Sequence, residues 1–167
     1  SLAFSYTKDH GIGKNIAPQW FGKRVGVTDN RAVRGKLLFR PSDTTRIVIA
    51  GDVVRSDNNT PYLITIENNN NQARYPQTPG VIPNPGEPFT VNNSANPTIY
   101  YNVKGLSATA TTEMGSYSLK SITAFRYTKQ IAAGDLDRSN LSLSSFRGIG
   151  KQKVFTQEAN LGFDNQG

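Results

Sequence analysis

The chain has 167 residues, of which 36% are hydrophobic and 19% charged, and its excess of small polar residues disfavours a helical bundle. It contains no cysteine, which excludes a disulfide framework and any thiolate metal site. The net charge of +7 is distributed along the chain and not clustered, so we expect no nucleic-acid partner.

Three segments in the first third of the chain alternate between apolar and polar residues, as a strand does when its two faces meet different surroundings. They are residues 1–9, 31–40 and 45–56. No apolar run is long enough for a transmembrane helix. Within each segment, the apolar residues fall on alternate positions and so on one face of the strand. They are Leu2, Phe4 and Tyr6 in the first, Val33, Leu37 and Phe39 in the second, and Ile47, Ile49 and Val53 in the third.

Three further segments occupy the second half, at residues 100–112, 116–129 and 153–164. The first is rich in Thr and Ala, so its parity is ambiguous. The other two alternate clearly, with Tyr117, Leu119, Phe125, Tyr127, Phe155, Ala159, Leu161 and Phe163 on the apolar parity. All six segments are close to the length that a tilted strand needs to cross a bilayer, and longer than usual soluble strands.

The connections between the segments alternate between long and short. Short turns lie at 41–43 and 113–115, whereas 10–30, 57–99 and 130–152 are long. Soluble domains rarely contain three long loops without secondary structure, whereas outer-membrane barrels combine tight periplasmic turns with long extracellular loops. The sequence therefore predicts an all-β fold, an antiparallel meander of about six long transmembrane-type strands that forms part of a larger outer-membrane β-barrel.

Aromatic residues occur near both ends of the expected strands. Phe39 and Tyr117 lie beside the short turns, and a second group lies near the long loops, as in the aromatic girdles of barrels. The second group is Tyr6, Tyr100, Tyr101 and Tyr127. Strand propensity alone explains any single one of them equally well.

Four stretches resemble TonB-dependent outer-membrane receptors. They are RGKLLFRPSDTTRIVIAGDVVRSDN (34–58), which is similar to a strand–turn–strand hairpin of that family, SYSLKSITAFRYTKQIAAGDLDRS (116–139), KVFTQEANLGFD (153–164) and AFSYTKDHGIGKN (3–15). They cover about half of the chain in the expected order. The loop at 57–99 matches nothing in the family.

The resemblance implies a bacterial outer-membrane location and active uptake of a scarce solute such as a ferric siderophore, cobalamin or a sugar. The implied partners are outer-membrane lipid, the rest of the barrel, a plug domain and, through that plug, TonB. Six strands without a plug imply an internal part of the barrel domain over residues 1–167. Six strands cannot close a barrel as large as those of this receptor family, so they leave two edges of the sheet unpaired.

No catalytic, cofactor or metal site is expected. Two Gly-Ile-Gly-Lys strings, at 11–14 and 148–151, lack the full phosphate-loop pattern and are interpreted as flexible loop glycines. Asp135 and Asp137 begin like a calcium loop but lack its required Gly and Glu, so a polar surface loop is expected. The single histidine, His10, is too few for a zinc site or a triad. We therefore expect no enzymatic activity.

Candidate substrate contacts are of two kinds. The first kind is cations on the polar parity, which would steer an anionic solute or, alternatively, pair with acidic groups of the absent plug or of neighbouring strands. These are Arg34, Lys36, Arg46, Lys120 and Arg126, together with Arg40. The second kind is aromatic residues in the long loops, which would contact a ligand or anchor a loop on its own barrel. These are Trp20, Tyr62 and Tyr75, together with Phe21.

Two rival interpretations remain open at this point. A passive porin-like barrel shares the strand pattern and differs in lacking an N-terminal plug. A soluble β-sandwich or small-barrel binding module predicts a protein that folds in water with its apolar parity buried.

Overall fold

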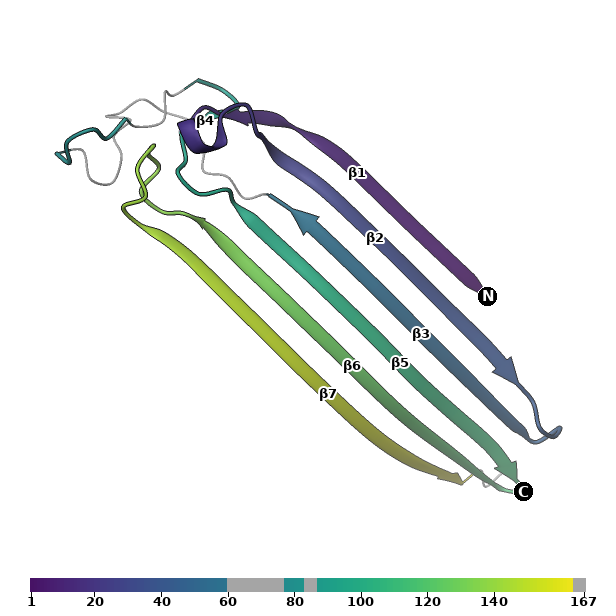
Figure 1. Cartoon of the computed structure of the whole chain (residues 1–167). Coiled ribbons are helices and arrows are strands. Elements are labelled where there is room, and N and C mark those ends of the chain that lie inside the picture. Colours follow the sequence, from purple (N-terminus) through teal and green to yellow (C-terminus); the bar gives the residue numbers. More distant parts are fainter. Residues whose placement is uncertain (60–76, 83–86, 164–167) are drawn as a thin grey trace.

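The computed structural model describes residues 1–59, 77–82 and 87–163 and shows one sheet, an antiparallel meander of long strands to which the short β4 adds in parallel at the end of β1 (Figure 1). The sheet order is β4-β1-β2-β3-β5-β6-β7. The predicted all-β, antiparallel fold is confirmed, and the sheet is open and not closed into a barrel. The elements are β1 (Leu2–Asn15), the short 3-10 helix η1 (Pro18–Trp20), β2 (Arg24–Phe39), β3 (Thr45–Asn58), β4 (Thr90–Val91), β5 (Thr98–Met114), β6 (Tyr117–Asp135) and β7 (Ser145–Phe163). Within the described ranges, no helix combines the length and the apolar character needed to cross a bilayer.

The strands are longer than the sequence pattern indicates. The connection from β1 to β2 covers only residues 16–23, and that from β6 to β7 only 136–144, so the expected loops 10–30 and 130–152 are too long. The extra strand residues are mostly polar or glycine and carry no alternating signal. They pair across the sheet nonetheless, for example Lys8 with Asp29 and Gly150 with Gln130. Such partners are far away in sequence and cannot be read from local periodicity.

Both Gly-Ile-Gly-Lys strings lie inside strands, at the end of β1 and in β7, so their interpretation as flexible loop glycines is wrong. The first string contains a β-bulge between His10 and Gly13. Gly11 adopts φ +71° there, and an added Cβ would collide with the carbonyl oxygen of Val25. Gly11 is therefore required by the backbone conformation of the bulge.

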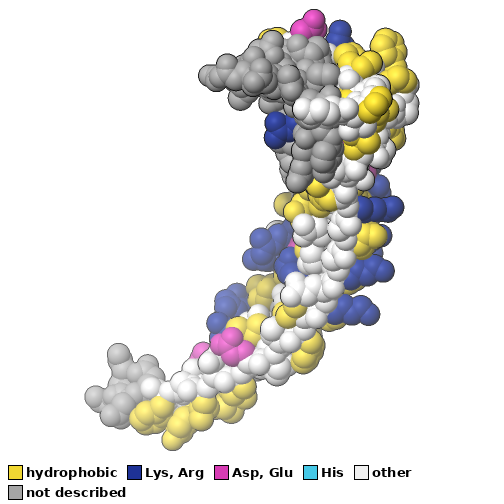
Figure 2. Space-filling view, turned by 90° about the vertical axis from the view of Figure 1, so that its left-hand side faces the viewer, with side chains coloured by type: hydrophobic (Ala, Val, Ile, Leu, Met, Phe, Trp, Pro, Cys, Tyr) yellow, Lys and Arg dark blue, Asp and Glu magenta, His cyan; other side chains and the backbone are white. Residues whose placement is uncertain are grey.

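The cross-strand register places alternate residues on two opposite faces. Residues that pair directly share a face, so the row Leu2, Gly35, Gly51, Leu106, Phe125 and Phe155 lies on one side of the sheet. The ambiguous parity of β5 is settled because Ala108 pairs with Ile49 on the same side. The sheet is bent, and Figure 2 views it along its β7 edge, with the convex side at the right.

Neither face of the sheet contains a hydrophobic core. Among the described residues, the only buried hydrophobic ones are Ala17, Val25 and Val91. They lie at the end opposite the short turns, where η1, β4 and the loops meet (Figure 1). The large apolar side chains of the sheet are exposed instead; Leu2 is 79% exposed, Leu37 72% and Phe155 67%.

Candidate functional site

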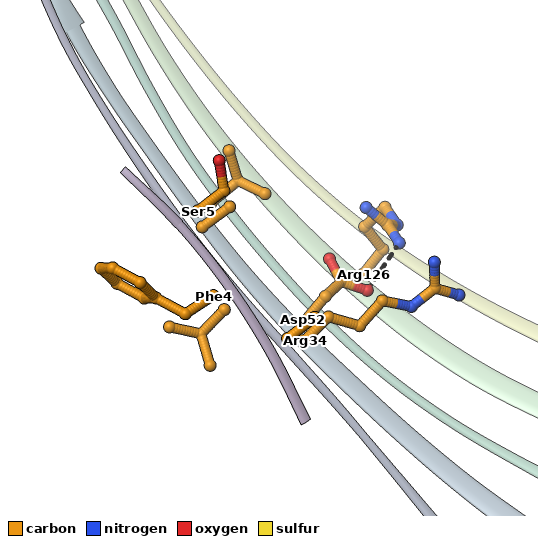
Figure 3. Close-up of a pocket in the computed structure, with 9 residues that line it drawn as sticks. Phe4, Ser5, Arg34, Asp52 and Arg126 are labelled. Carbon is orange, nitrogen blue, oxygen red and sulfur yellow. Dashed lines mark hydrogen bonds and ion pairs between the residues drawn. The ribbon is translucent and has the colours of Figure 1, made fainter. Parts of the chain in front are cut away.

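The concave face carries the charged side chains that the sequence indicates as candidate contacts. In the register, Arg34 pairs with Asp52, which pairs with Gly105, which in turn pairs with Arg126. Figure 3 shows Arg34, Asp52 and Arg126 together on one side of the sheet and Phe4 projecting from the other. The register thus places two predicted cations in one row with a carboxylate.

The ion pair of this row joins Arg126 Nη2 to Asp52 Oδ1 at 3.2 Å. Arg126 reaches across β5, and Gly105 makes this reach possible: a Cβ there would lie 2.7 Å from Asp52 Oδ1 and 3.0 Å from Arg126 Nη2. Both side chains are partly exposed to solvent, so the pair contributes at most about 1 kcal/mol to stability. Its effect is to order one guanidinium. Arg34 forms no ion pair with any described residue.

An open hollow of about 370 Å³ lies beside this row. Its lining comes from β1, β2, β3 and β6 and consists of Ala3, Phe4, Ser5, Ala32, Val33, Arg34, Asp52, Val54 and Arg126 (Figure 3). Because neighbouring strand residues point to opposite faces, Phe4 and Val33 contribute backbone to it. The hollow combines an apolar floor with two guanidinium groups, an arrangement that suits an anionic group attached to an apolar one.

The remaining cations of the concave face are not gathered into one site. Arg46 and Lys120 share a row, separated by Thr111, and Lys36 lies in another row. All three are exposed and form no ion pair with the described part of the chain. Arg40 follows the end of β2 and is exposed as well. The concave face therefore carries cations spread over its surface, and among the candidate cations only Arg126 is held by an ion pair with a described residue.

The convex face differs from the concave face in charge along the same strand segments. In the rows from Met114, Tyr117 and Phe163 to Leu106 and Phe155, no described residue of the convex face is charged. Its polar side chains bond to one another. Each of these pairs satisfies polar groups without water. The pairs are Thr45 with Thr112 (Oγ1 to Oγ1, 2.9 Å), Thr123 Oγ1 with Gln157 Oε1 (2.5 Å) and Gln157 Nε2 with Ser121 Oγ (3.0 Å).

Aromatic side chains border this charge-free zone at both ends. Tyr117 and Phe163 contact each other beside the short turn, with ring centroids 5.0 Å apart. Tyr6, Tyr100 and Tyr127 lie towards the other end on the same face, whereas the register turns Tyr101 to the concave face. Three of the four tyrosines that the sequence places near the long loops therefore lie on the convex face.

Among the loop aromatics, Trp20 anchors a loop. Its Nε1 donates a hydrogen bond to the Ser94 carbonyl oxygen at 2.8 Å, and the side chain is half-buried. Phe21 is 76% exposed. Tyr62 and Tyr75 lie outside the described residues.

Asp135 and Asp137 are buried and do not form a surface loop, so that expectation is wrong. Asp135 accepts hydrogen bonds from the amides of Ser94, Asp137 and Arg138 and from the Ser94 hydroxyl. Asp137 accepts from the amides of Ser139, Leu143 and Ser144 and from the Ser139 hydroxyl. The carboxylates close the β6–β7 connection and have no free oxygen for an ion. The spacing Asp-x-Asp-x-Ser, typical of side-chain turns, was the available signal.

The structure contains no candidate metal centre within its described ranges: no three His, Cys, Asp or Glu side chains cluster there. His10 is exposed. No family model matches the chain, and neither curated proteins nor solved structures provide a significant match.

Proposed function

We propose that the chain forms part of the wall of a β-barrel in a bacterial outer membrane and serves active uptake of a scarce solute, as in TonB-dependent receptors. The observation that carries the proposal is that, between the short turns and the row of Leu106 and Phe155, the described convex face has no charged side chain, whereas the concave face of the same strand segments has several. Outer-membrane barrels have this division, with lipid outside and water inside.

The dimensions of the charge-free zone support the proposal. On β6 it extends from Tyr117 to Phe125, which are eight residues apart. At about 3.3 Å per residue this is about 26 Å along the strand. A tilt of about 40° reduces it to a height of about 20 Å, close to the apolar band of about 25 Å in outer-membrane barrels.

The open edges of the sheet support a place inside a larger assembly. β7 has 19 residues and pairs, among the described residues, only with β6. A long unpaired strand is a site for aggregation unless another strand covers it. Further strands of a barrel would pair with both edges.

Uptake of a solute, as opposed to a purely structural role, rests on the resemblance of four stretches to TonB-dependent receptors and on the cationic concave face. The face would line the interior of the barrel, where Arg34 and Arg126 would attract an anionic solute. A passive porin would share this geometry. Collapse of the proton-motive force distinguishes the two, because it stops TonB-dependent uptake and leaves diffusion through a porin unchanged.

The test of the membrane location uses two neighbouring residues on opposite faces. Ala110 lies on the convex face, in the middle row of the charge-free zone, and Thr109 lies on the concave face of β5. Ala110→Arg should reduce the stability of the inserted protein by about 2–4 kcal/mol, because a cation near the middle of the bilayer is costly on the lipid side. Thr109→Arg should cost much less, since it faces water.

The measurement is urea unfolding of the protein in lipid vesicles, followed by tryptophan fluorescence. If Ala110→Arg and Thr109→Arg reduce the unfolding free energy equally, or if Ala110→Arg has no effect, the convex face does not contact hydrocarbon. The proposal would then be wrong. A soluble module predicts that Ala110→Arg improves solubility in water.

A further inference from the structure

The convex face carries a belt of cations immediately beyond its apolar zone. The cationic belt consists of Arg31, Arg55, Lys104, Lys129, Lys151 and Lys153, from five strands. Lys104 and Lys153 flank Tyr127 in one row, and the other four lie in the next row away from the short turns. In Figure 2, Lys and Arg side chains project from the convex side above a hydrophobic strip.

The cations of the belt are placed against one another. Arg31 pairs directly with Arg55, and Lys129 pairs directly with Lys151. Like charges in direct cross-strand pairs destabilise a sheet. An arrangement of this kind is stable when negative charge from outside the sheet lies between the cations.

The protein itself supplies little of that negative charge. Asp29 binds Arg31 at 2.8 Å, and Asp57 lies 3.8 Å from Arg55. The four lysines of the belt form no ion pair with any described residue. Lys129 lies over the Tyr100 ring, with its Nζ 5.9 Å from the ring centroid, which orients the ammonium group and does not neutralise it.

We propose that the cationic belt binds the phosphate groups of anionic lipid headgroups in the outer leaflet. The inference rests on the proposed membrane location, because it places the belt at the height where hydrocarbon ends and phosphate begins. Tyrosines at the same height, Tyr6 under Arg31 and Tyr100 under Arg55, hold the guanidinium groups by cation–π contacts of 5.5 and 5.6 Å to the ring centroids. Lysines provide flexible point charges for phosphate, and arginines provide paired donors.

The position of the belt favours a lipid headgroup over a soluble anion. The belt is spread over the outer curvature of five strands, and the open hollow of about 250 Å³ next to it is lined by only one of its cations, Lys104. A dissolved phosphate would remain largely hydrated on such an open surface. A lipid phosphate is held at this height by its acyl chains, so several weak contacts act together.

The experiment compares lipids retained by the protein after mild detergent extraction from vesicles of phosphatidylcholine with a minor fraction of phosphatidylglycerol or of lipid A. One variant replaces four belt lysines by Gln, at Lys104, Lys129, Lys151 and Lys153. A matched variant removes four charges from the concave face by Gln at Arg34, Lys36, Arg46 and Lys120, so both lose the same net charge. Lipid retention is the only readout used for this control.

The wild-type protein should retain the phosphorylated anionic lipids in excess over their share of the vesicle. Each cation near a membrane surface contributes about a fivefold preference, so the belt variant should lose this enrichment by at least about tenfold. The concave variant should keep it. Equal losses in both variants would reduce the effect to net charge and overturn the proposal, as would the absence of enrichment in the wild type.

Two further measurements distinguish a lipid ligand from a free anion, and a failure of the belt proposal from a failure of the proposed function. Inorganic phosphate at matched ionic strength should not displace the retained lipid; displacement would assign the belt to a free anion and overturn the lipid assignment. Protease protection in pure phosphatidylcholine vesicles tests insertion independently. Loss of protection there refutes the proposed function itself, whereas insertion without lipid enrichment refutes only the belt.

Discussion

The carboxylate of Asp137 offers the sharpest test of what holds the β6–β7 connection. Its side chain is fully buried, and it accepts hydrogen bonds from the amides of Ser139 (3.1 Å), Leu143 (3.2 Å) and Ser144 (2.8 Å) and from the Ser139 hydroxyl (2.5 Å). Asp137→Ala leaves three amide groups without their acceptor. We expect it to open the connection between β6 and β7.

The magnitude follows from the burial of the groups concerned. An unsatisfied buried donor costs about 1–3 kcal/mol, and of the three donors only Ser139 belongs to a buried residue. Leu143 and Ser144 reach water after a small movement. We therefore expect a cost of about 2–3 kcal/mol for local opening, which corresponds to a roughly 30- to 150-fold larger open population.

Tryptic cleavage after Arg138 measures this opening. Arg138 is exposed but lies in the closed connection at φ +58°, and cleavage tracks the open population when reclosing is fast. Mass spectrometry of the products, with the protein in detergent, gives the rate at this bond. Asp57→Ala removes an exposed carboxylate 3.8 Å from Arg55 and serves as the control, with an expected change of less than about twofold. If both variants are cleaved at the same rate, the buried carboxylate does not close the connection.

Three other substitutions test separate features. Gly11→Ala should reduce stability by about 1–3 kcal/mol, because φ is +71° there and the Cβ meets the Val25 carbonyl; thermal unfolding measures it, and an unchanged midpoint would contradict the bulge geometry. Trp20→Phe should cost about 1 kcal/mol through loss of the bond to Ser94, seen as faster hydrogen exchange in residues 15–24; unchanged exchange would leave the bond without effect. Arg126→Glu should weaken uptake of an anionic solute and not of a neutral one; equal uptake of the anion would leave Arg126 with only a structural role.

The sequence predicts the faces of the sheet well because large apolar residues alternate strictly near the short turns. In β2 and β3 this identifies the convex side at Leu37 and Ile49, which the register confirms as a direct pair. β5 could not be assigned in this way, since Ala and Thr tolerate either environment. Its face follows only from pairing with β3, a contact between residues about 60 positions apart in sequence.

The ends of the strands were not predictable for a related reason. If the chain lies in a membrane as proposed, both faces meet water beyond the apolar zone, so the alternation stops while the hydrogen-bonded ladder continues. Gly148 and Gly150 of β7 have poor strand propensity, yet they pair with Ala132 and Gln130. The same limit applies to the candidate site: Arg34 and Arg126 are visible in the sequence, but Gly105, which lets Arg126 reach Asp52, gains its role only from the register.

The exposed apolar surface supports the proposed contact of the convex face with hydrocarbon over contact with water. Burial of one Leu or Phe side chain contributes about 1.5–3 kcal/mol. Leu2, Leu37, Leu106, Phe155 and Leu161 are each at least 59% exposed, so in water these five alone forgo about 7–15 kcal/mol, as much as the whole net stability of a typical domain. A second sheet would cover them in a sandwich, but the described residues form one sheet only. The hydrogen bonds of Gln157 to Thr123 and Ser121 would bring little in water, where both partners are solvated. In hydrocarbon they become necessary, because no solvent replaces them.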